Sequence, residues 1–206
     1  MFITFEGLDC SGKSTQAKLL VDCLVQRGND VVFLREPGGT AISEMIREIL
    51  LDRKNLGITQ KAELFLFSAA RAQLVSQVIQ PALEAGRVVV CDRFYDSTSA
   101  YQGYGRSLDL DDVRIVNSIA VAGTRPDLTV LVDVEIDEIS RRRHRAGFPA
   151  DRMEVSGGQF FERVREGYRA LAREEPDRFI LVDGMNPIDS VHKEILQIVQ
   201  SRWRVP

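Results

Sequence analysis

Short apolar runs alternate with longer stretches of helical periodicity along this chain of 206 residues. The runs are rich in β-branched and aromatic residues and almost continuously apolar, which is typical of strands covered on both faces. The segments between them are long enough for crossover helices, and this alternation predicts a parallel sheet in an α/β fold. The five predicted strands are residues 2–5, 31–34, 87–91, 128–132 and 179–182.

Apolar residues recur at three- and four-residue spacing between these runs, as expected for amphipathic helices. The longest predicted helix covers residues 60–85, with Pro81 near its end. Asp109 is placed to cap a helix that continues to Ala122. The remaining predicted helices are residues 14–26, residues 42–51, a helix from Ser156 or Gly157 to about residue 173, and residues 188–203.

A polar residue directly follows each predicted strand. These residues are Glu6, Arg35 with Glu36, Asp92 with Arg93, Asp133 and Asp183. The carboxyl ends of parallel strands meet at one edge of a sheet, and ligands of open α/β sheets bind there. We therefore expect the functional site at this edge, with helices on both faces of the sheet.

The first strand leads directly into the pattern G-x-x-x-x-G-K-S, formed by Gly7, Gly12, Lys13 and Ser14. In such a loop the glycines let successive backbone N–H groups turn inward around phosphates. The lysine adds a positive charge, and the hydroxyl of the serine can bind Mg²⁺. The pattern predicts a nucleotide phosphate site of the P-loop NTPase type. The predicted ATP-binding residues are Gly7, Leu8, Asp9, Cys10, Ser11, Gly12, Lys13, Ser14 and Thr15.

The charge and the hydropathy of the chain indicate which classes of binding partner can be expected. The chain has 27 Lys and Arg residues against 30 Asp and Glu residues, a net charge of −3 and a pI near 5.5, so we expect no nucleic-acid partner. No apolar run approaches the ~20 residues that span a bilayer, so we expect no membrane partner. Small molecules are the expected substrates.

The three cysteines, Cys10, Cys23 and Cys91, are odd in number and lack C-x-x-C spacing. Neither a disulfide framework nor a zinc site is indicated, and a reducing cytoplasmic location fits. The length allows one good core, so residues 1–206 are predicted to form a single domain.

Two arginine-containing segments suggest phosphate chemistry. Asp92 could hold a Mg²⁺-bound water and Arg93 could bind a phosphoryl group with its two-pronged guanidinium, although the pair could also be a structural ion pair.

Five arginines fall within residues 141–152, interrupted by glycine and proline. This run could be a solvated helix face, but near a phosphate site it is better explained as a lid over about residues 141–153.

Two pairs with four-residue spacing could bind a nucleobase. Phe67 and Arg71 share one helix face and offer a ring for stacking and a donor for a base carbonyl. Thr98 and Gln102 form the second pair, with Tyr101 beside them. Taken alone, such a pair would more often be one residue of the core and one on the surface. The two pairs support a base-binding site only when they are considered together.

Taken together, these motifs resemble the bacterial thymidylate kinases, members of the nucleoside monophosphate kinase family, along nearly the full chain. The motifs that carry the resemblance are Phe5-Glu6-Gly7-Leu8-Asp9, Arg35-Glu36-Pro37-Gly38-Gly39-Thr40, Ala69-Ala70-Arg71-Ala72-Gln73, Asp92-Arg93-Phe94 with Ser97-Thr98, Ala100-Tyr101-Gln102-Gly103, and Asp151-Arg152-Met153-Glu154. The resemblance implies transfer of the γ-phosphoryl group of ATP to deoxythymidine monophosphate (dTMP), which forms the diphosphate dTDP. It also implies a homodimer.

The resemblance further implies roles for particular residues. Asp9 would lie near the 3′-hydroxyl and phosphate of dTMP, Arg47 and Arg93 would hold that phosphate, and Tyr101 would crowd the 2′ position. Phe67 would stack on thymine, Arg71 would contact O4, and Thr98 with Gln102 would contact the remaining polar edge. Glu36, Pro37 and Ser97 complete the predicted substrate site, and Mg²⁺ would be held by Ser14 and, through water, by Asp92.

The predicted catalytic residues are Lys13, Asp9 and Arg93, together with a lid arginine. Some members of the family carry the catalytic arginine in the P-loop and others in the lid. Cys10 occupies the P-loop position here, so Arg143, Arg145 and Arg152 are the candidates. The segment of residues 148–150 makes the lid longer than the short turn expected, and the three candidates are not ranked.

Two alternatives stay open on the sequence. One is a kinase of the same fold acting on another nucleotide or on a nucleoside. The other is a nucleotide-dependent switch without transfer activity, although the guanine-reading N-K-x-D motif of GTP switches is absent.

Overall fold

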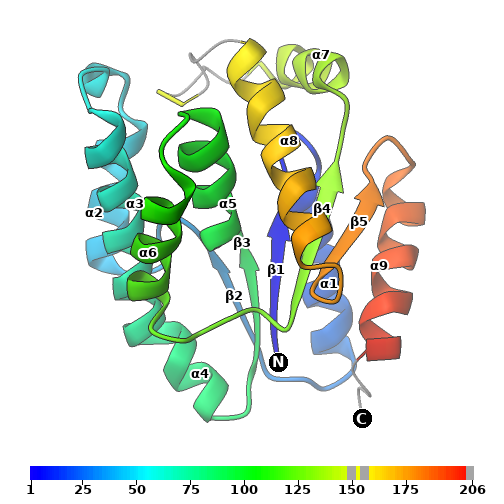
Figure 1. Ribbon diagram of the computed structural model, residues 1–206. Coiled ribbons are helices and arrows are strands. Elements are labelled where there is room, and N and C mark those ends of the chain that lie inside the picture. Colours follow the sequence, from blue (N-terminus) through cyan, green and yellow to red (C-terminus); the bar gives the residue numbers. More distant parts are fainter. Residues whose placement is uncertain (148–151, 154–157, 203–206) are drawn as a thin grey trace.

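The computed structural model describes residues 1–147, 152–153 and 158–202. Its centre is a five-stranded sheet, in which every pair of neighbouring strands is parallel, with the order β2-β3-β1-β4-β5. The sheet is flanked by helices on both faces (Figure 1), as the alternation of strands and helices predicts. The strands are β1 (Phe2–Glu6), β2 (Val31–Arg35), β3 (Val88–Asp92), β4 (Leu128–Asp133) and β5 (Phe179–Asp183).

All five strands were predicted, and each ends one residue later than its apolar run. The extra residues are Glu6, Arg35, Asp92, Asp133 and Asp183, so the strands carry these polar groups to the edge of the sheet. At the other end, Arg87 lies outside β3 because it belongs to the preceding turn, where its N–H donates to the carbonyl of Ala82 at 3.0 Å.

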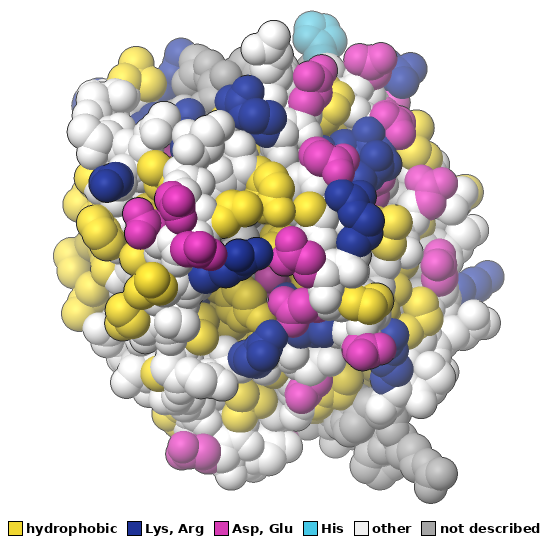
Figure 2. Space-filling model, in the orientation of Figure 1, with side chains coloured by type: hydrophobic (Ala, Val, Ile, Leu, Met, Phe, Trp, Pro, Cys, Tyr) yellow, Lys and Arg dark blue, Asp and Glu magenta, His cyan; other side chains and the backbone are white. Residues whose placement is uncertain are grey.

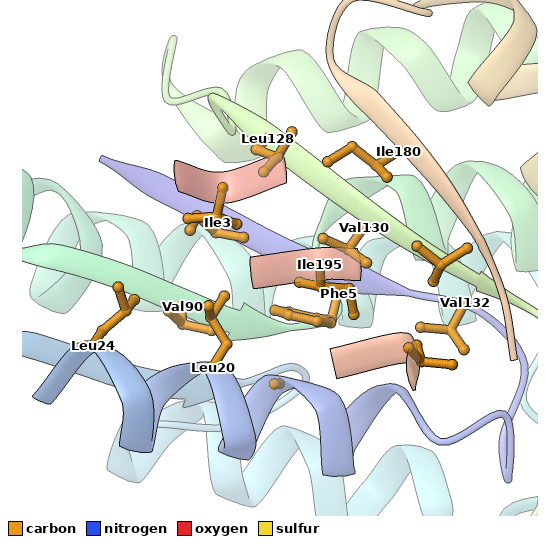
Figure 3. Close-up of a cluster of buried hydrophobic side chains, with 14 of the residues drawn as sticks. Ile3, Phe5, Leu20, Leu24, Val90, Leu128, Val130, Val132, Ile180 and Ile195 are labelled. Atoms are coloured by element: carbon orange, nitrogen blue, oxygen red, sulfur yellow. The ribbon is translucent and has the colours of Figure 1, made fainter. Parts of the chain in front are cut away.

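One face of the sheet is covered by α1 (Lys13–Gln26) and α9 (Ile188–Arg202). Successive side chains of a strand point to opposite faces, so Ile3 and Phe5 of β1 both point toward these helices. Figure 3 shows them packed with Leu20 of α1 and Ile195 of α9. This layer of apolar contacts holds α1 in place, and with it the loop that connects β1 to α1.

The other face carries α3 (Gln60–Leu74), α5 (Tyr95–Thr98), α6 (Leu110–Val121) and α8 (Gly158–Glu174), with α2 (Ala41–Leu51) packed against α3. Phe2 of β1 and Cys91 of β3 pack with Leu74 and Phe94 on this side. Leu131 of β4 packs with the α8 side chains instead. The α6 helix begins as predicted, because the carboxylate of Asp109 accepts from two N–H groups of its first turn.

The predicted helix over residues 60–85 is one helical rod with a wide turn. It consists of α3, the π-helical segment η2 (Val75–Ile79) and α4 (Gln80–Glu84). The N–H of Gln80 donates to the carbonyl of Val75, five residues earlier. Pro81 follows, has no N–H to donate and crowds the preceding turn, so the wide turn lets the rod continue past it.

Three helical segments lie outside the predicted helices, although a helix face was one explanation considered for residues 141–152. They are the turn η1 (Arg53–Asn55), the helix formed by α5 and the π-helical segment η3 (Ser99–Gly105), and α7 (Ile136–Ala146). The α7 helix contains the first part of the predicted lid, while residues 148–151 lie outside the described residues. Ser156, Gly157 and Trp203, where two predicted helices begin or end, also lie outside them. Among the described helices, none combines the length and apolar character needed to cross a bilayer.

Candidate functional site

The loop between β1 and α1 has the backbone of a phosphate cradle. Gly7 has φ +138°, and a Cβ there would lie 2.5 Å from the carbonyl oxygen of Val132, so only glycine fits. Gly12 has φ +98° and caps α1, whose first N–H groups and helix dipole favour an anion at this point. The predicted P-loop is therefore present at the carboxyl end of β1.

Lys13 is held within this loop. Its side chain is buried, and Nζ donates to the carbonyl of Leu8 at 3.3 Å and lies 3.5 Å from Oδ1 of Asp9. The P-loop lysine thus faces back across its own loop toward Asp9.

Arg93 approaches the same carboxylate from the neighbouring strand. It follows β3 in a left-handed conformation with φ +74°, and its N–H donates to the carbonyl of Phe5 at 2.9 Å. Its Nη2 lies 2.6 Å from Oδ1 of Asp9, the oxygen that also faces Lys13. Burial alone would raise the pKa of Asp9, but Arg93 and Lys13 outweigh it and lower that pKa. Lys13, at the start of α1, and Arg93, directly after β3, therefore meet at one ionised oxygen.

A set of buried hydroxyl groups orients Arg93 from behind. Nη1 of Arg93 donates to Ser97 at 3.0 Å and to the hydroxyl of Tyr168 at 3.1 Å. Both hydroxyls also contact Oε2 of Glu6, at 2.6 Å and 2.8 Å. The second carboxylate oxygen, Oε1, accepts the N–H of Phe94 at 2.7 Å. The guanidinium is thereby fixed with one edge toward Asp9.

A cleft of about 570 Å³, including its open mouth, extends from Arg93 toward α2 and α3. All eleven residues predicted to bind the acceptor line it. They are Asp9, Glu36, Pro37, Arg47, Phe67, Arg71, Arg93, Ser97, Thr98, Tyr101 and Gln102. Residues from four separate segments of the chain are thus brought together.

Arg71 closes the inner end of this cleft. Its guanidinium is buried and lies 2.7 Å from Oε2 of Glu36, and Nη2 donates to the carbonyl of Phe94 at 3.2 Å. Burial, only partly offset by Arg71, raises the pKa of Glu36. Oε1 of Glu36 is buried without a hydrogen-bond partner among the described residues. A ligand hydroxyl in the cleft can satisfy it.

A second cleft of about 830 Å³ lies on the other side of the P-loop. Cys10, Ser11, Gly12 and Thr15 of the P-loop line it, together with residues of α7, of the segment after β5 and of α9. Arg142 of α7 bridges the two walls, since it donates to the carbonyl of Ser11 at 3.2 Å and to that of Gly184 at 2.8 Å. Arg145 also lines this cleft.

The three candidate catalytic arginines lie in different surroundings. Arg145 lines the cleft beside the P-loop, whereas Arg143 lies over the ring of Phe161 at 5.0 Å. Arg152 is buried, with Nη1 2.6 Å from the buried carboxylate of Glu63 and Nε donating to the carbonyl of Leu50. The structure therefore does not bring Arg152 to the P-loop, because Glu63 of α3 and the carbonyl of Leu50 in α2 engage its guanidinium.

The oxygen atoms of Ser14 and Asp92, the predicted Mg²⁺ ligands, differ in their exposure. Ser14 is exposed at the start of α1. Oδ1 of Asp92 is buried and has no hydrogen-bond partner among the described residues. Within that part of the chain no group of three or more His, Cys, Asp or Glu side chains could enclose a metal. These oxygens fit Mg²⁺ as kinases hold it, with few protein ligands and the rest from phosphates and water.

Several residues of the site were not predicted. Glu6 was recognised only as a polar strand end, and Tyr168 and Asn117 carry no local signal because they reach the site from α8 and α6. Arg142 lies within the predicted lid but was not singled out. A pattern of four-residue spacings detects partners on one helix, and these residues meet partners far away in sequence.

A phosphate cradle and an arginine-lined cleft that share one carboxylate at the edge of a parallel sheet define a P-loop nucleotide kinase. The sequence profile of the family described as thymidylate kinase matches residues 5–195. The chain belongs to the thymidylate kinase family.

Individual relatives agree with this assignment. The chain is 49% identical over 199 residues to a thymidylate kinase of Caldanaerobacter subterraneus subsp. tengcongensis, covering 97% of this chain and 94% of that protein. It is 50% identical over 210 residues to one of Desulfovibrio desulfuricans, covering 99% and 97%. A crystal structure of thymidylate kinase from Ehrlichia chaffeensis has 36% identity and a TM-score of 0.80, covering 97% of this chain and 98% of that one.

Proposed function

We propose that dTMP binds in the cleft that runs from Arg93 to Arg71, and that the phosphates of ATP bind in the P-loop at Lys13. As a member of its family, the chain transfers the γ-phosphoryl group of ATP to dTMP and forms dTDP. The observation that carries the proposed arrangement is the contact of Lys13 and Arg93 with the same oxygen of Asp9. A donor phosphate at one cation is then adjacent to an acceptor phosphate at the other.

Phosphoryl transfer mainly requires that two polyanions be aligned and that the charge developing between them be cancelled. In the proposed arrangement, Lys13 and the amino end of α1 do this for ATP, while Arg93 and Arg47 do it for dTMP. The attacking group is a phosphate oxygen, which is already anionic near neutral pH, so no general base is needed. Asp9 keeps the two cations oriented and lies near the sugar of dTMP.

The remaining contacts of dTMP are proposed for residues that line the cleft. Phe67 stacks on thymine, Arg71 donates to O4, and Thr98 with Gln102 contacts the other polar groups of the base. Tyr101, whose hydroxyl lies 3.2 Å from Asp9, crowds the 2′ position and selects against ribose. Glu36, Pro37 and Ser97 complete the site, and the unpartnered Oε1 of Glu36 can accept from a sugar hydroxyl.

We also propose that the enzyme uses Mg²⁺, held by Ser14 and, through water, by Asp92. The bound ion would neutralise charge on the phosphates of ATP. The chain would hold the ion with the exposed hydroxyl of Ser14 at the first turn of α1 and the carboxylate of Asp92 at the end of β3, whose Oδ1 is buried.

The catalytic arginine of the predicted lid is proposed to be Arg145. It lies on the helix that lines the cleft beside the P-loop, whereas Arg143 faces an aromatic ring and Arg152 faces Glu63. Arg152, in this proposal, shapes the acceptor cleft, since the adjacent Met153 lines that cleft. Closure of residues 141–153 over the phosphates would exclude water, which otherwise competes with dTMP as the acceptor.

Three further proposals concern the whole chain. A homodimer is supported by the exposed apolar side chains of Phe65, Ile115 and Ile119 on α3 and α6. A cytoplasmic location is supported by three cysteines without a disulfide. A single domain over residues 1–206 is supported by one continuous sheet.

The test is ADP formation with and without dTMP, compared in the wild type and in two variants that flank β3. Arg93→Met should reduce kcat/KM for dTMP by at least about 100-fold, because it removes a charge from the phosphate being attacked. Arg87→Met, at the other end of β3 and paired with Asp30, should leave it unchanged. ADP formation that ignores the acceptor, or equal rates for Arg93→Met and wild type, would contradict the proposal.

A further inference from the structure

Arg71 can distinguish thymine from other bases only if its N–H groups point in fixed directions. A guanidinium carries five N–H donors in one plane, and rotation about the side-chain bonds would present different donors to the base. The side chain is 2% exposed, so its surroundings decide this orientation.

Three acceptors surround the guanidinium. Oε2 of Glu36 accepts from Nε at 2.7 Å and lies 2.7 Å from Nη2, and the carbonyl of Phe94 accepts from Nη2 at 3.2 Å. Oδ1 of Asn117 accepts from Nη1 at 3.2 Å. Nη1 carries two N–H groups, and among the described residues Asn117 accepts from one of them, so the other remains for a carbonyl oxygen in the cleft.

Asn117 comes from α6, on the side of Arg71 away from the cleft, and is 5% exposed. Its amide orientation is determined by its other contacts. Nδ2 donates to the hydroxyl oxygen of Ser99 at 3.1 Å and to the carbonyl of Tyr95 at 3.4 Å. The hydroxyl of Ser99 donates its own hydrogen to the same carbonyl at 3.3 Å, so it can only accept from Asn117. Oδ1 of Asn117 must therefore face Arg71.

We propose that Asn117 is a positioning residue for base selection: it fixes Nη1 of Arg71 so that a single N–H points at O4 of thymine. The inference rests on the proposed contact of Arg71 with the base. Cytosine carries an amino group at position 4, so a fixed N–H at this point would meet another donor. A site built to hydrogen-bond one group rejects an analogue that lacks it. Without Asn117, the guanidinium can turn, and the penalty against cytosine decreases.

The experiment compares kcat/KM for dTMP and for dCMP in variants of nearly equal volume. Asn117→Leu removes the acceptor, and we expect the KM for dTMP to rise at least about tenfold, with a similar fall in the dTMP-to-dCMP ratio. The KM for ATP should stay within about twofold of the wild type. Asn117→Asp keeps an oxygen facing Arg71 and should lose less selectivity than Asn117→Leu.

Two controls separate positioning from a general structural effect. Ser118→Ala changes the exposed neighbour of Asn117 on α6 and should change neither KM. Asn117→Ala removes the same acceptor with a side chain smaller than asparagine, so it should fit even if leucine does not, and the same changes are expected. Equal losses for dTMP and ATP, or equal losses in the leucine and aspartate variants, would overturn the inference.

The variant Arg71→Met separates the proposed contact of Arg71 with the base from the positioning role of Asn117. If Asn117 acts through Arg71, adding Asn117→Leu to Arg71→Met should cause no further loss of selectivity. If Arg71→Met lowers selectivity and Asn117→Leu does not, the inference fails and the proposed base contact stands. If Arg71→Met itself leaves selectivity intact, the proposed base contact fails, and the inference fails with it.

Discussion

Asp9 is the residue at which the two proposed phosphate sites meet. One of its oxygens faces Lys13 and Arg93, and the other accepts from the hydroxyl of Tyr101 at 3.2 Å. These contacts hold two cations near each other while no phosphate is bound. Phosphates can then replace the carboxylate as the partner of each cation with little rearrangement, which is the preorganisation that phosphoryl transfer requires.

Glu6 is the buried acid that holds this arrangement from behind. Burial, reinforced by the nearby carboxylate of Asp96 and partly offset by Arg93, raises the pKa of Glu6 to about 7. Its unperturbed pKa is 4.5, so between these values the folded chain keeps a proton that the unfolded chain has released. The linkage relation then makes the free energy of unfolding fall as pH rises through this window.

We predict that Glu6→Gln removes most of this pH dependence. Gln resembles the protonated acid, because it can accept from Phe94 and donate to a neighbouring hydroxyl. Between pH 5 and pH 8 the wild type should lose roughly 2–3 kcal/mol more stability than the variant. Glu36 contributes in the same direction and His192 in the opposite one, and both are unchanged in the comparison. Urea unfolding at several pH values measures the slopes, and equal slopes would contradict the prediction.

The site residues that the sequence predicts differ from those it does not predict in how far along the chain their interaction partners lie. Lys13, Arg93 and Arg71 were predictable because each stands in a local motif or directly follows a strand. Tyr168 and Asn117 were not, because their partners Arg93 and Arg71 lie 75 and 46 positions away. Tertiary packing determines such pairs, and one sequence contains no local trace of them.

At the scale of elements, the strands were predictable because their apolar runs are short and bounded by polar residues. The turn type of the helices was not. The wide turns at Val75–Ile79 and Ser99–Gly105 cover only five and seven residues, too few for their period to be distinguished from that of an α-helix. The second of these carries Tyr101 and Gln102 into the acceptor cleft.

A buried ion pair ties α5 to the start of β5. Arg178 contacts both oxygens of Asp96, at 2.6 Å and 2.9 Å, and also the hydroxyl of Thr129 in β4 at 2.6 Å. Asp96 is fully buried and Arg178 is 7% exposed. This pair anchors the helix that carries Ser97 and Thr98 into the site.

We predict that Arg178→Met lowers the free energy of unfolding by about 3–5 kcal/mol, since it leaves the carboxylate of Asp96 buried without its charged partner. The matched control is Arg125→Met, which removes a 64% exposed side chain paired with Glu175 and should cost about 0–1 kcal/mol. Urea unfolding of both variants provides the comparison. A loss below 1 kcal/mol for Arg178→Met would show that the pair does not anchor α5.

At the scale of the whole molecule, positive and negative side chains are interleaved on the face over α6 and α8 (Figure 2). Arg114 of α6 pairs with Glu174 of α8, and Arg125 pairs with Glu175. Apolar exposure is concentrated elsewhere on α6, at Ile115 and Ile119, beside Phe65 of α3. The two kinds of surface therefore occupy different sides of the same helix.

We predict that Ile119→Glu weakens the proposed homodimer, because it places a charge at the centre of an apolar surface that a second copy would cover. Sedimentation should give twice the chain mass of 23.2 kDa for the wild type and a monomer for the variant. Val25→Glu, which changes an exposed apolar residue on α1, is the control and should remain dimeric. A monomeric wild type would contradict the proposal.

In the proposed arrangement, ATP and dTMP meet end to end at one edge of the sheet, with Lys13 and Arg93 on either side of the transferred group. The most direct measurement is inhibition by a compound in which adenosine and deoxythymidine are joined 5′ to 5′ by a polyphosphate chain. We expect this compound to compete with both substrates and to bind far more tightly than either nucleotide alone, because its second half binds at high effective concentration. Competition with only one substrate would contradict the proposed arrangement.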